Sequence, residues 1–456
     1  MRRFATALVL LAAAACGGGG GSSSSGGFPP VTGTPPPTPP PRQLRKYIKH
    51  VVVIVQENRS FDNFFHGFTG ARYANSGFLH DGTKVELQPM TLTGPDISHG
   101  FGDALNDYDS GKMDRFDLNP MGPGRRAGTY AYQYVDPRYI RPYWSMAQQY
   151  VLADEMFPPE LGGSFTAHLD LIAGTTNLQP DLAEVDSPSG MPWGCDAPAG
   201  TRTSTLDRTR LERVGGGPFP CFSQFATMAD LFDAANVSWA YYAPAVDGKD
   251  VGGRVFSEFS AIDAIRHGPD WERNVISPPS TVLNDVARSR LPNVAWVIPD
   301  FRDSDHPGNG SNSGPSWVAS IVNEIGESPY WDSTAIVVLW DDWGGWYDHV
   351  PPPQIDFRGL GERVPCIIIS AYAKRGVVSH TRYEFGSILA LMEEAFGLPK
   401  LDTLDRGSGY TDRRAFSLTD AFDFHKKARP FRPIQTPYSR AFFLTKAPSL
   451  RAPDDQ

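Results

Sequence analysis

A run of apolar residues from Val51 to Val55 restricts the fold of this chain more than any other feature. The run is β-branched and has no polar interruption, which is typical of a strand buried on both faces of a parallel sheet. It ends abruptly in Gln56, Glu57 and Asn58. Because open α/β sheets bind their ligands at the carboxyl ends of their strands, the sequence predicts a site at this point.

Further apolar runs predict strands at Val294–Ile298, Ala335–Trp340 and Val364–Ser370, with helical patterns between them. Strands that alternate with helices predict an α/β fold with a mostly parallel central sheet, flanked by helices. The stretch from Ala71 to Asp117 has no clear periodicity and is predicted to form long loops. The stretch from Tyr139 to Ala153 has near-helical spacing and is predicted to be helical throughout.

Two of these later strands also end in residues that bind metals. His306 follows one strand, and Asp341 and Asp342 follow the next. Adjacent carboxylates repel each other unless a cation or a proton neutralises them. Together with Glu57 and Asn58, the two aspartates predict a divalent metal site, and His306 is a candidate for charge stabilisation and proton transfer. The alternative is a set of strand-end turns and helix caps.

A candidate functional residue of another kind is Ser164, which follows two glycines and begins a helical pattern. A helix N-terminus binds anions and presents a hydroxyl outward, so Ser164 is a candidate nucleophile. The alternative is a plain helix cap. His99 lies in a loop and is a candidate ligand for phosphate or metal, with a surface histidine as the alternative.

The N-terminus is predicted to be a targeting segment. Residues 1–16 contain an apolar run too short to span a bilayer and end at Cys16, as in a bacterial lipoprotein signal, although a simple secretory signal also fits. Residues 17–45 form a Gly/Ser-rich and then Pro-rich tether. We expect residues 46–456 to be one extracytoplasmic domain, either lipid-anchored at the membrane or secreted.

A formal net charge of −9 argues against nucleic-acid binding that does not depend on sequence. Residues 177–222 are rich in Pro, Gly and Ser and are predicted to be a surface insertion. Cys195 and Cys221 lie in it and are candidates for a disulfide in an oxidising compartment. Cys366 lies in an apolar run and is predicted to be a buried thiol.

Three motifs resemble one family. Glu57–Asp62, Asp341–Val350 and Val364–Ser370 resemble the bacterial phosphoesterase family, which contains phosphatidylcholine-type phospholipases C and acid phosphatases. The similarity covers roughly residues 46 to 425. It implies an alkaline-phosphatase-like α/β fold and a hydroxyl nucleophile that acts on a metal.

The resemblance also assigns roles to residues. It implies Ser164 as the nucleophile, although both prolines of the family's G-P-[ST]-x-P segment are missing here. One divalent metal ion of unknown identity is implied, with the following ligands: Glu57, Asn58, Ser164, Asp341 and Asp342.

The same resemblance places His99 and His306 around the phosphate. His349 matches the family's Y-D-H-V sequence, either as a catalytic residue or as one that orients the turn. His168 lies where phospholipase members commonly have an arginine, and its role is open.

The function expected from these residues is hydrolysis of a phosphoric ester through a phosphoserine. The expected activity is that of a phospholipase C, with a phospholipid substrate. The alternatives are an acid phosphatase and, less favoured, a non-catalytic surface protein. Aromatic residues near the motifs are expected to form core, with a cage for a choline head group as the alternative: Phe64, Phe65, Trp343, Trp346 and Tyr347.

Overall fold

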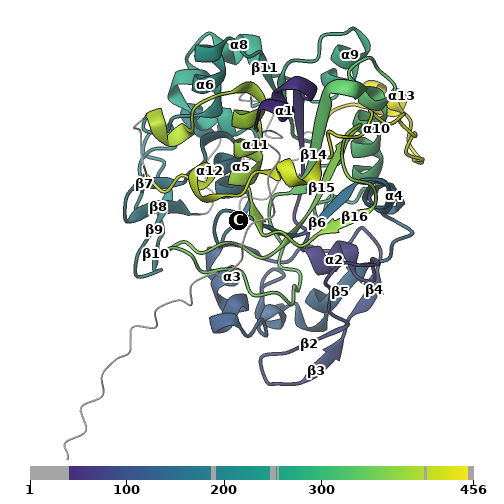
Figure 1. The fold of residues 1–456 in the computed structure, drawn as a ribbon. Helices are drawn as coiled ribbons and strands as arrows, with labels where there is room; N and C mark the ends of the chain where they lie inside the picture. The colour runs from purple at the N-terminus through teal and green to yellow at the C-terminus, as the bar shows by residue number, and fades with distance from the viewer. Residues whose placement is uncertain (1–40, 186–191, 247–252, 254–255, 405–407, 450–456) are drawn as a thin grey trace, which may run out of the picture. The chain divides into compact units, whose positions relative to one another are not determined.

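The computed structural model describes residues 41–185, 192–246, 253, 256–404 and 408–449 (Figure 1). The predicted signal segment with Cys16 and most of the predicted tether lie outside these residues. The described residues belong to one compact unit. Its first helix already includes the end of the predicted tether, and Leu44 of that helix is fully buried. No helix among the described residues has the length and apolar character needed to cross a membrane.

The β-strands are β1 (His50–Gln56), β2 (Ser76–Phe78), β3 (Lys84–Glu86), β4 (Gln88–Met90), β5 (Gln133–Val135), β6 (Val151–Phe157), β7 (Asn177–Gln179), β8 (Leu182–Val185), β9 (Ser204–Asp207), β10 (Glu212–Arg213), β11 (Trp239–Tyr242), β12 (Val275–Ile276), β13 (Val294–Val297), β14 (Thr334–Trp340), β15 (Val364–Ser370), β16 (Val377–Ser379) and β17 (Tyr383–Glu384). The α-helices are α1 (Pro41–Tyr47), α2 (Phe61–Phe65), α3 (Phe101–Tyr108), α4 (Arg141–Gln149), α5 (Ser164–Ala173), α6 (Met228–Ala235), α7 (Asp263–Arg266), α8 (Asp270–Asn274), α9 (Thr281–Ala287), α10 (Gly314–Gly326), α11 (Gly386–Phe396), α12 (Thr411–Arg414) and α13 (Arg440–Thr445).

Within the described residues, the main sheet has nine strands in the order β12-β11-β13-β1-β14-β15-β6-β16, and β17 pairs with β6. β1 is parallel to both β13 and β14. Only β15 in this sheet is antiparallel to its neighbours, β14 and β6. The expected α/β class with a mostly parallel sheet is therefore confirmed. Because β13, β1 and β14 are adjacent and parallel, the residues that follow them meet at one edge.

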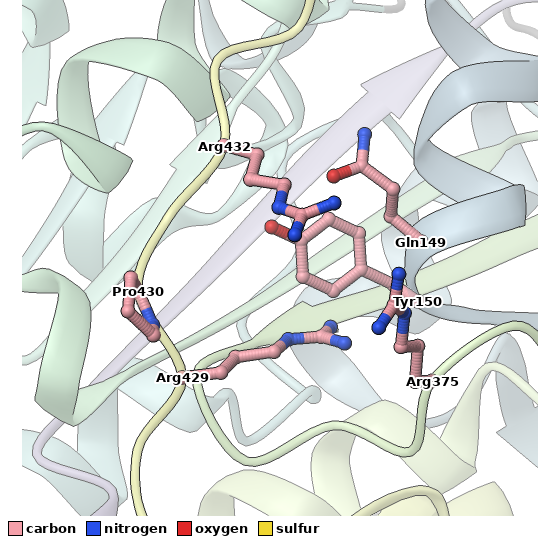
Figure 2. Close-up of a pocket in the computed structure, with 6 residues that line it drawn as sticks. All are labelled: Gln149, Tyr150, Arg375, Arg429, Pro430 and Arg432. Atoms are coloured by element: carbon pink, nitrogen blue, oxygen red, sulfur yellow. The ribbon is translucent and has the colours of Figure 1, made fainter.

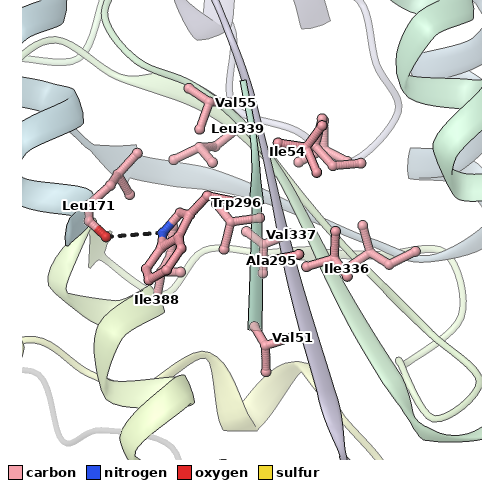
Figure 3. Close-up of a cluster of buried hydrophobic side chains, with 14 of the residues drawn as sticks. Val51, Ile54, Val55, Leu171, Ala295, Trp296, Ile336, Val337, Leu339 and Ile388 are labelled. Carbon is pink, nitrogen blue, oxygen red and sulfur yellow. Dashed lines mark hydrogen bonds between the residues drawn. The ribbon is translucent and has the colours of Figure 1, made fainter. Parts of the chain in front are cut away.

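Helices cover both faces of this sheet, with α5 and α11 on one side and α4 and α10 on the other (Figure 1). Figure 3 shows Trp296 of β13 between the sheet and these first two helices, beside Leu171 and Ile388. The Trp296 indole donates a hydrogen bond of 3.2 Å to the Leu171 carbonyl. The Val51–Val55 run is fully buried, as expected for a strand covered on both faces.

The predicted helix from Tyr139 to Ala153 is wrong in its last part. Helix α4 ends at Gln149, and the chain continues as strand β6. Two charged residues, Asp154 and Glu155, hide the strand pattern in the sequence. Asp154 is nevertheless fully buried, and its carboxylate lies 2.9 Å from His380 Nδ1, a partner far along the chain.

Residues 177–222 contain a four-stranded antiparallel sheet, β10-β9-β8-β7. Val185 and Leu206 of this sheet are fully buried in a second core, which also contains Trp343. Cys195 and Cys221 form a disulfide. Cys366 is a buried free thiol in β15, and burial raises its pKa.

Candidate active site

The first part of the site is the end of strand β1. Glu57 and Asn58 are fully buried, directly after the strand. Asn58 has a φ of 56°, a left-handed conformation that non-glycine residues seldom adopt. Its backbone N–H donates to Asp341 Oδ1 at 3.0 Å, and its side-chain amide donates to Asp342 Oδ1 at 3.2 Å. These two hydrogen bonds connect the carboxyl ends of the adjacent strands β1 and β14.

The adjacent carboxylates of Asp341 and Asp342 are fully buried, and their pKa values are shifted in opposite directions. Burial raises the pKa of Asp342 well above its ordinary value, and the charge of Asp341 adds to this effect. Burial opposes ionisation of Asp341 too, but contacts with Glu57, His168 and other groups hold its pKa below the ordinary value. Both carboxylates stay ionised together only where positive charge, from a cation or from neighbouring imidazoles, offsets their repulsion.

Two glycines after Asp342 allow the loop to pass close to β1. Gly344 and Gly345 have φ values of 63° and 72°. A Cβ at Gly344 would lie 2.3 Å from the Asn58 carbonyl oxygen, and one at Gly345 would lie 2.5 Å from Ile97. A side chain at Gly344 would push the Asp342 loop away from Asn58, and one at Gly345 would push it away from Ile97, so the geometry of the site requires both glycines.

Ser164 is the first residue of α5, as the sequence predicts. Its hydroxyl donates to Asp342 Oδ2 at 3.1 Å. The loop between β6 and α5 brings Ser164 to the same sheet edge as the carboxylates. At this position the N-terminal dipole of α5 stabilises negative charge on an oxygen.

His168 is the residue that sequence reasoning left without a role. Its Nε2 lies 3.2 Å from Glu57 Oε1 and 3.7 Å from Asp341 Oδ2. His168 is fully enclosed, and burial lowers its pKa, although the charge of Asp341 opposes this effect. A helical spacing of four residues places His168 on the same face of α5 as Ser164, and this spacing was the available signal in the sequence.

The residues of this cluster fit a divalent metal ion. Glu57, Asp341 and His168 offer ligand atoms that all lie within 4.8 Å of one another. Asn58 Oδ1 and Asp341 Oδ2 are buried without a hydrogen-bond partner among the described residues. Carboxylate, amide and imidazole donors are common ligands of divalent metals in proteins.

His99 and His306 lie on the other side of Asp342, and both lower its pKa through their charge. Their ring centroids are 5.9 Å apart. His99 Nδ1 lies 2.6 Å from the Ile97 carbonyl, and His306 Nδ1 lies 2.5 Å from the Pro307 carbonyl. A carbonyl only accepts, so each Nδ1 carries its proton. His99 Nε2 lies 2.6 Å from the Asn58 amide nitrogen.

His349 lies in a different network. Its Nδ1 is 2.6 Å from Asp62 Oδ2 and 3.3 Å from the Arg363 guanidinium. Arg363 also donates to both carboxylate oxygens of Asp348, at 2.8 and 3.0 Å. Asp62, Asp348 and His349 have metal-like spacing, but the Arg363 guanidinium already supplies the positive charge. The contacts of His349 with Asp62 and Arg363 therefore help to hold the loop that follows Asp342, and they do not involve Ser164.

The aromatic residues near the motifs are core. Phe64, Phe65, Trp343 and Trp346 are fully buried, and Tyr347 is nearly so. The Trp343 indole donates to Asp107 Oδ2 at 3.2 Å, which fixes the ring behind the site. Phe64 and Phe65 belong to the main core, and Trp343, Trp346 and Tyr347 pack the loop after Asp342 in the second core.

Comparisons with known proteins find similar sequences and structures. The chain is 26% identical over 445 residues to Phospholipase C A of Mycobacterium tuberculosis, covering 85% of this chain and 79% of that protein. It is 24% identical over 441 residues to the non-hemolytic phospholipase C of Pseudomonas aeruginosa, covering 83% of this chain and 58% of that protein. A structure from Vibrio parahaemolyticus, described as a protein in the alkaline phosphatase superfamily, overlays with a TM-score of 0.35 at 12% identity, covering 82% and 70% of the two chains. The model of the Phosphoesterase family matches residues 48–399, and the chain belongs to that family.

Proposed function

We propose that this protein is a metal-dependent phospholipase C that acts through a phosphoserine on Ser164. The observation that carries this proposal is the convergence of Glu57, Asp341 and His168 on one point beside the Ser164 hydroxyl. The similarity to two phospholipases C supports a phospholipid substrate. The disulfide supports an extracytoplasmic location.

The ligands of the ion would be Glu57, Asn58, Asp341, Asp342 and Ser164, with His168 added by its position. When bound, the ion lowers the pKa of a coordinated hydroxyl and offsets negative charge on phosphoryl oxygens.

The chain's own groups then perform two displacements. The Ser164 oxygen attacks phosphorus, its proton passes to a neighbouring base, and the bond from phosphorus to the leaving alcohol breaks. The N-terminus of α5 stabilises the developing negative charge. One histidine of the pair His99 and His306 gives a proton to the leaving alcohol. Water then attacks the phosphoserine, which releases the phosphorylated head group and restores the Ser164 hydroxyl.

The substrate class is tested with two chromogenic esters. We expect turnover of p-nitrophenyl phosphorylcholine, a diester, because a phospholipase C cleaves a phosphodiester bond. Hydrolysis of p-nitrophenyl phosphate alone would overturn the phospholipase assignment in favour of an acid phosphatase of the same family.

Metal removal tests the proposed dependence of turnover on a divalent ion. Chelation followed by dialysis should lower turnover of the better ester by at least about tenfold, because the buried carboxylates lose their counter-charge and Ser164 loses its activator. Addition of single divalent ions should restore turnover and identify the metal. A sample shown by elemental analysis to be metal-free that keeps full turnover would contradict metal dependence.

A further inference from the structure

A pocket rich in arginine lies at the opposite edge of the main sheet from Ser164. It has a volume of about 300 Å³ and is lined by Gln149, Tyr150, Arg375, Arg429, Pro430 and Arg432. Tyr150 directly precedes β6, whereas Ser164 follows the other end of that strand. The seven residues of β6 separate the two regions by roughly 20 Å. The pocket is therefore distinct from the catalytic edge.

Three chain segments far apart in sequence build the pocket. Figure 2 shows Arg429 and Arg432 entering from the C-terminal segment, Arg375 from the loop before β16, and Gln149 and Tyr150 from the end of α4. All three guanidinium groups lie around the ring of Tyr150 in this view. No carboxylate of the described residues lines the pocket. This concentration of positive charge is unusual on a chain with a net charge of −9.

Arg429 is held in place by its backbone. Its N–H donates to the Ala371 carbonyl at 3.1 Å, and its own carbonyl accepts from the Trp331 indole at 2.7 Å. The guanidinium stacks over the Tyr150 ring, 4.1 Å from its centroid. One of its nitrogens, Nη2, is buried and has no hydrogen-bond partner among the described residues. The contact with the Tyr150 ring holds the guanidinium in this orientation, and Arg429 lines the pocket.

The charges in the pocket repel one another. Burial lowers the pKa of Arg429, and the charges of Arg375 and Arg432 lower it further, with Tyr150 opposing them. The turn that presents Arg375 contains Gly376, with a φ of 58°, where a Cβ would lie 2.9 Å from the Gln148 carbonyl oxygen. Close packing against the end of α4 therefore fixes the backbone from which the exposed Arg375 side chain extends beside Arg429. An anion in the pocket would neutralise these charges.

We propose that this pocket is a second binding site, separate from the active site, for a phosphate-bearing anion. Guanidinium groups form paired hydrogen bonds with phosphate oxygens, and clusters of arginines recognise phosphorylated ligands. A volume of about 300 Å³ is at the lower end for small-molecule pockets and suits a phosphorylated head group. The same chemistry is offered by free phosphate compounds and by anionic phospholipid head groups.

The test compares two double variants of the full-length protein. Arg375→Gln/Arg432→Gln removes two exposed charges from the pocket. Arg273→Gln/Arg288→Gln removes two exposed charges elsewhere, with the same change in net charge. Binding is measured by calorimetry with inorganic phosphate, and by sedimentation with vesicles of phosphatidylglycerol and phosphatidylcholine. Phosphate bound at the active site contributes equally to both variants and cancels in the comparison.

We expect the pocket variant to lose at least about tenfold in affinity for one of these probes relative to wild type, while the matched variant does not. Loss with phosphate identifies a free phosphate compound, and loss only with vesicles identifies a lipid head group. Equal affinities of the two variants for both probes would overturn the proposal. Turnover of the chromogenic esters should stay unchanged in both variants, so failure here is separate from failure of the proposed function.

Discussion

Replacement of Ser164 by alanine is expected to abolish turnover of either chromogenic ester, with a loss of at least about a thousandfold. The variant lacks the only group that we assign as the attacking atom, while the N-terminus of α5 and the buried carboxylates remain. The fold should be kept, because the hydrogen bonds of the serine hydroxyl go to the site carboxylates Asp341 and Asp342 and its removal leaves little space. Turnover is measured at saturating ester, and the fold is monitored by circular dichroism and thermal unfolding.

The matched control is Ser320→Ala. Ser320 is a buried serine of α10 whose hydroxyl donates to the Ser316 carbonyl within the same helix. It makes no contact with the catalytic residues, so this variant should keep wild-type turnover. If Ser164→Ala kept wild-type turnover as well, the nucleophile would have to be another group. Trapping of labelled phosphate on wild type, and its absence on Ser164→Ala, gives a readout that a structural role would not produce.

Of the substitutions proposed, replacement of Arg363 by methionine is expected to lower the free energy of unfolding the most. Arg363 is fully buried and forms ion pairs with the buried carboxylates of Asp62 and Asp348. Its removal leaves the buried Asp348 without its ion-pair partner and Asp62 with His349 alone, which costs about 3–5 kcal/mol. Urea unfolding followed by tryptophan fluorescence measures the change in the free energy of unfolding.

Two further variants make this result specific. Arg138→Met removes an exposed ion pair with Asp136 and should change stability little, because solvent screens such pairs. Adding Asp62→Asn and Asp348→Asn to Arg363→Met removes the stranded charges and should recover part of the loss. A triple variant no more stable than Arg363→Met would mean that packing, and not charge, is the function of this guanidinium.

The sequence predicts the cluster at the carboxyl ends of β1 and β14 well because the signals there are local. The apolar run before Glu57 and the run before Asp341 each define a buried strand and its end. Since parallel strands end at one edge, the two polar groups were expected to meet, and the hydrogen bonds from Asn58 to Asp341 and Asp342 confirm this. Ser164 at the start of α5 was predictable for the same reason, from two glycines before a helical pattern.

The features that the sequence does not predict depend on distant partners. Strand β6 was hidden because Asp154 looks like a surface residue, and only the fold brings His380 to its carboxylate. His168 belongs to the site because the fold packs α5 against Glu57, which is far away in the sequence. The metal-like group around Asp62 cannot be distinguished from a real metal site until Arg363 is seen between its carboxylates.

The reversed direction of β15 has a consequence for how such a site can diversify. Because β15 runs antiparallel to β14, the connection between them leaves and re-enters the sheet at the catalytic edge. Asp342 lies at its beginning and Arg363 at its end, and each is held by buried partners. The middle of this connection returns to itself through a hydrogen bond from Leu360 N–H to the Pro353 carbonyl. The centre is held as well, because Arg358 is fully buried and donates to the Thr176 hydroxyl and the Gly409 carbonyl. A change in the length of this connection would therefore break contacts at its centre as well as at its ends, which limits variation on this side of the site.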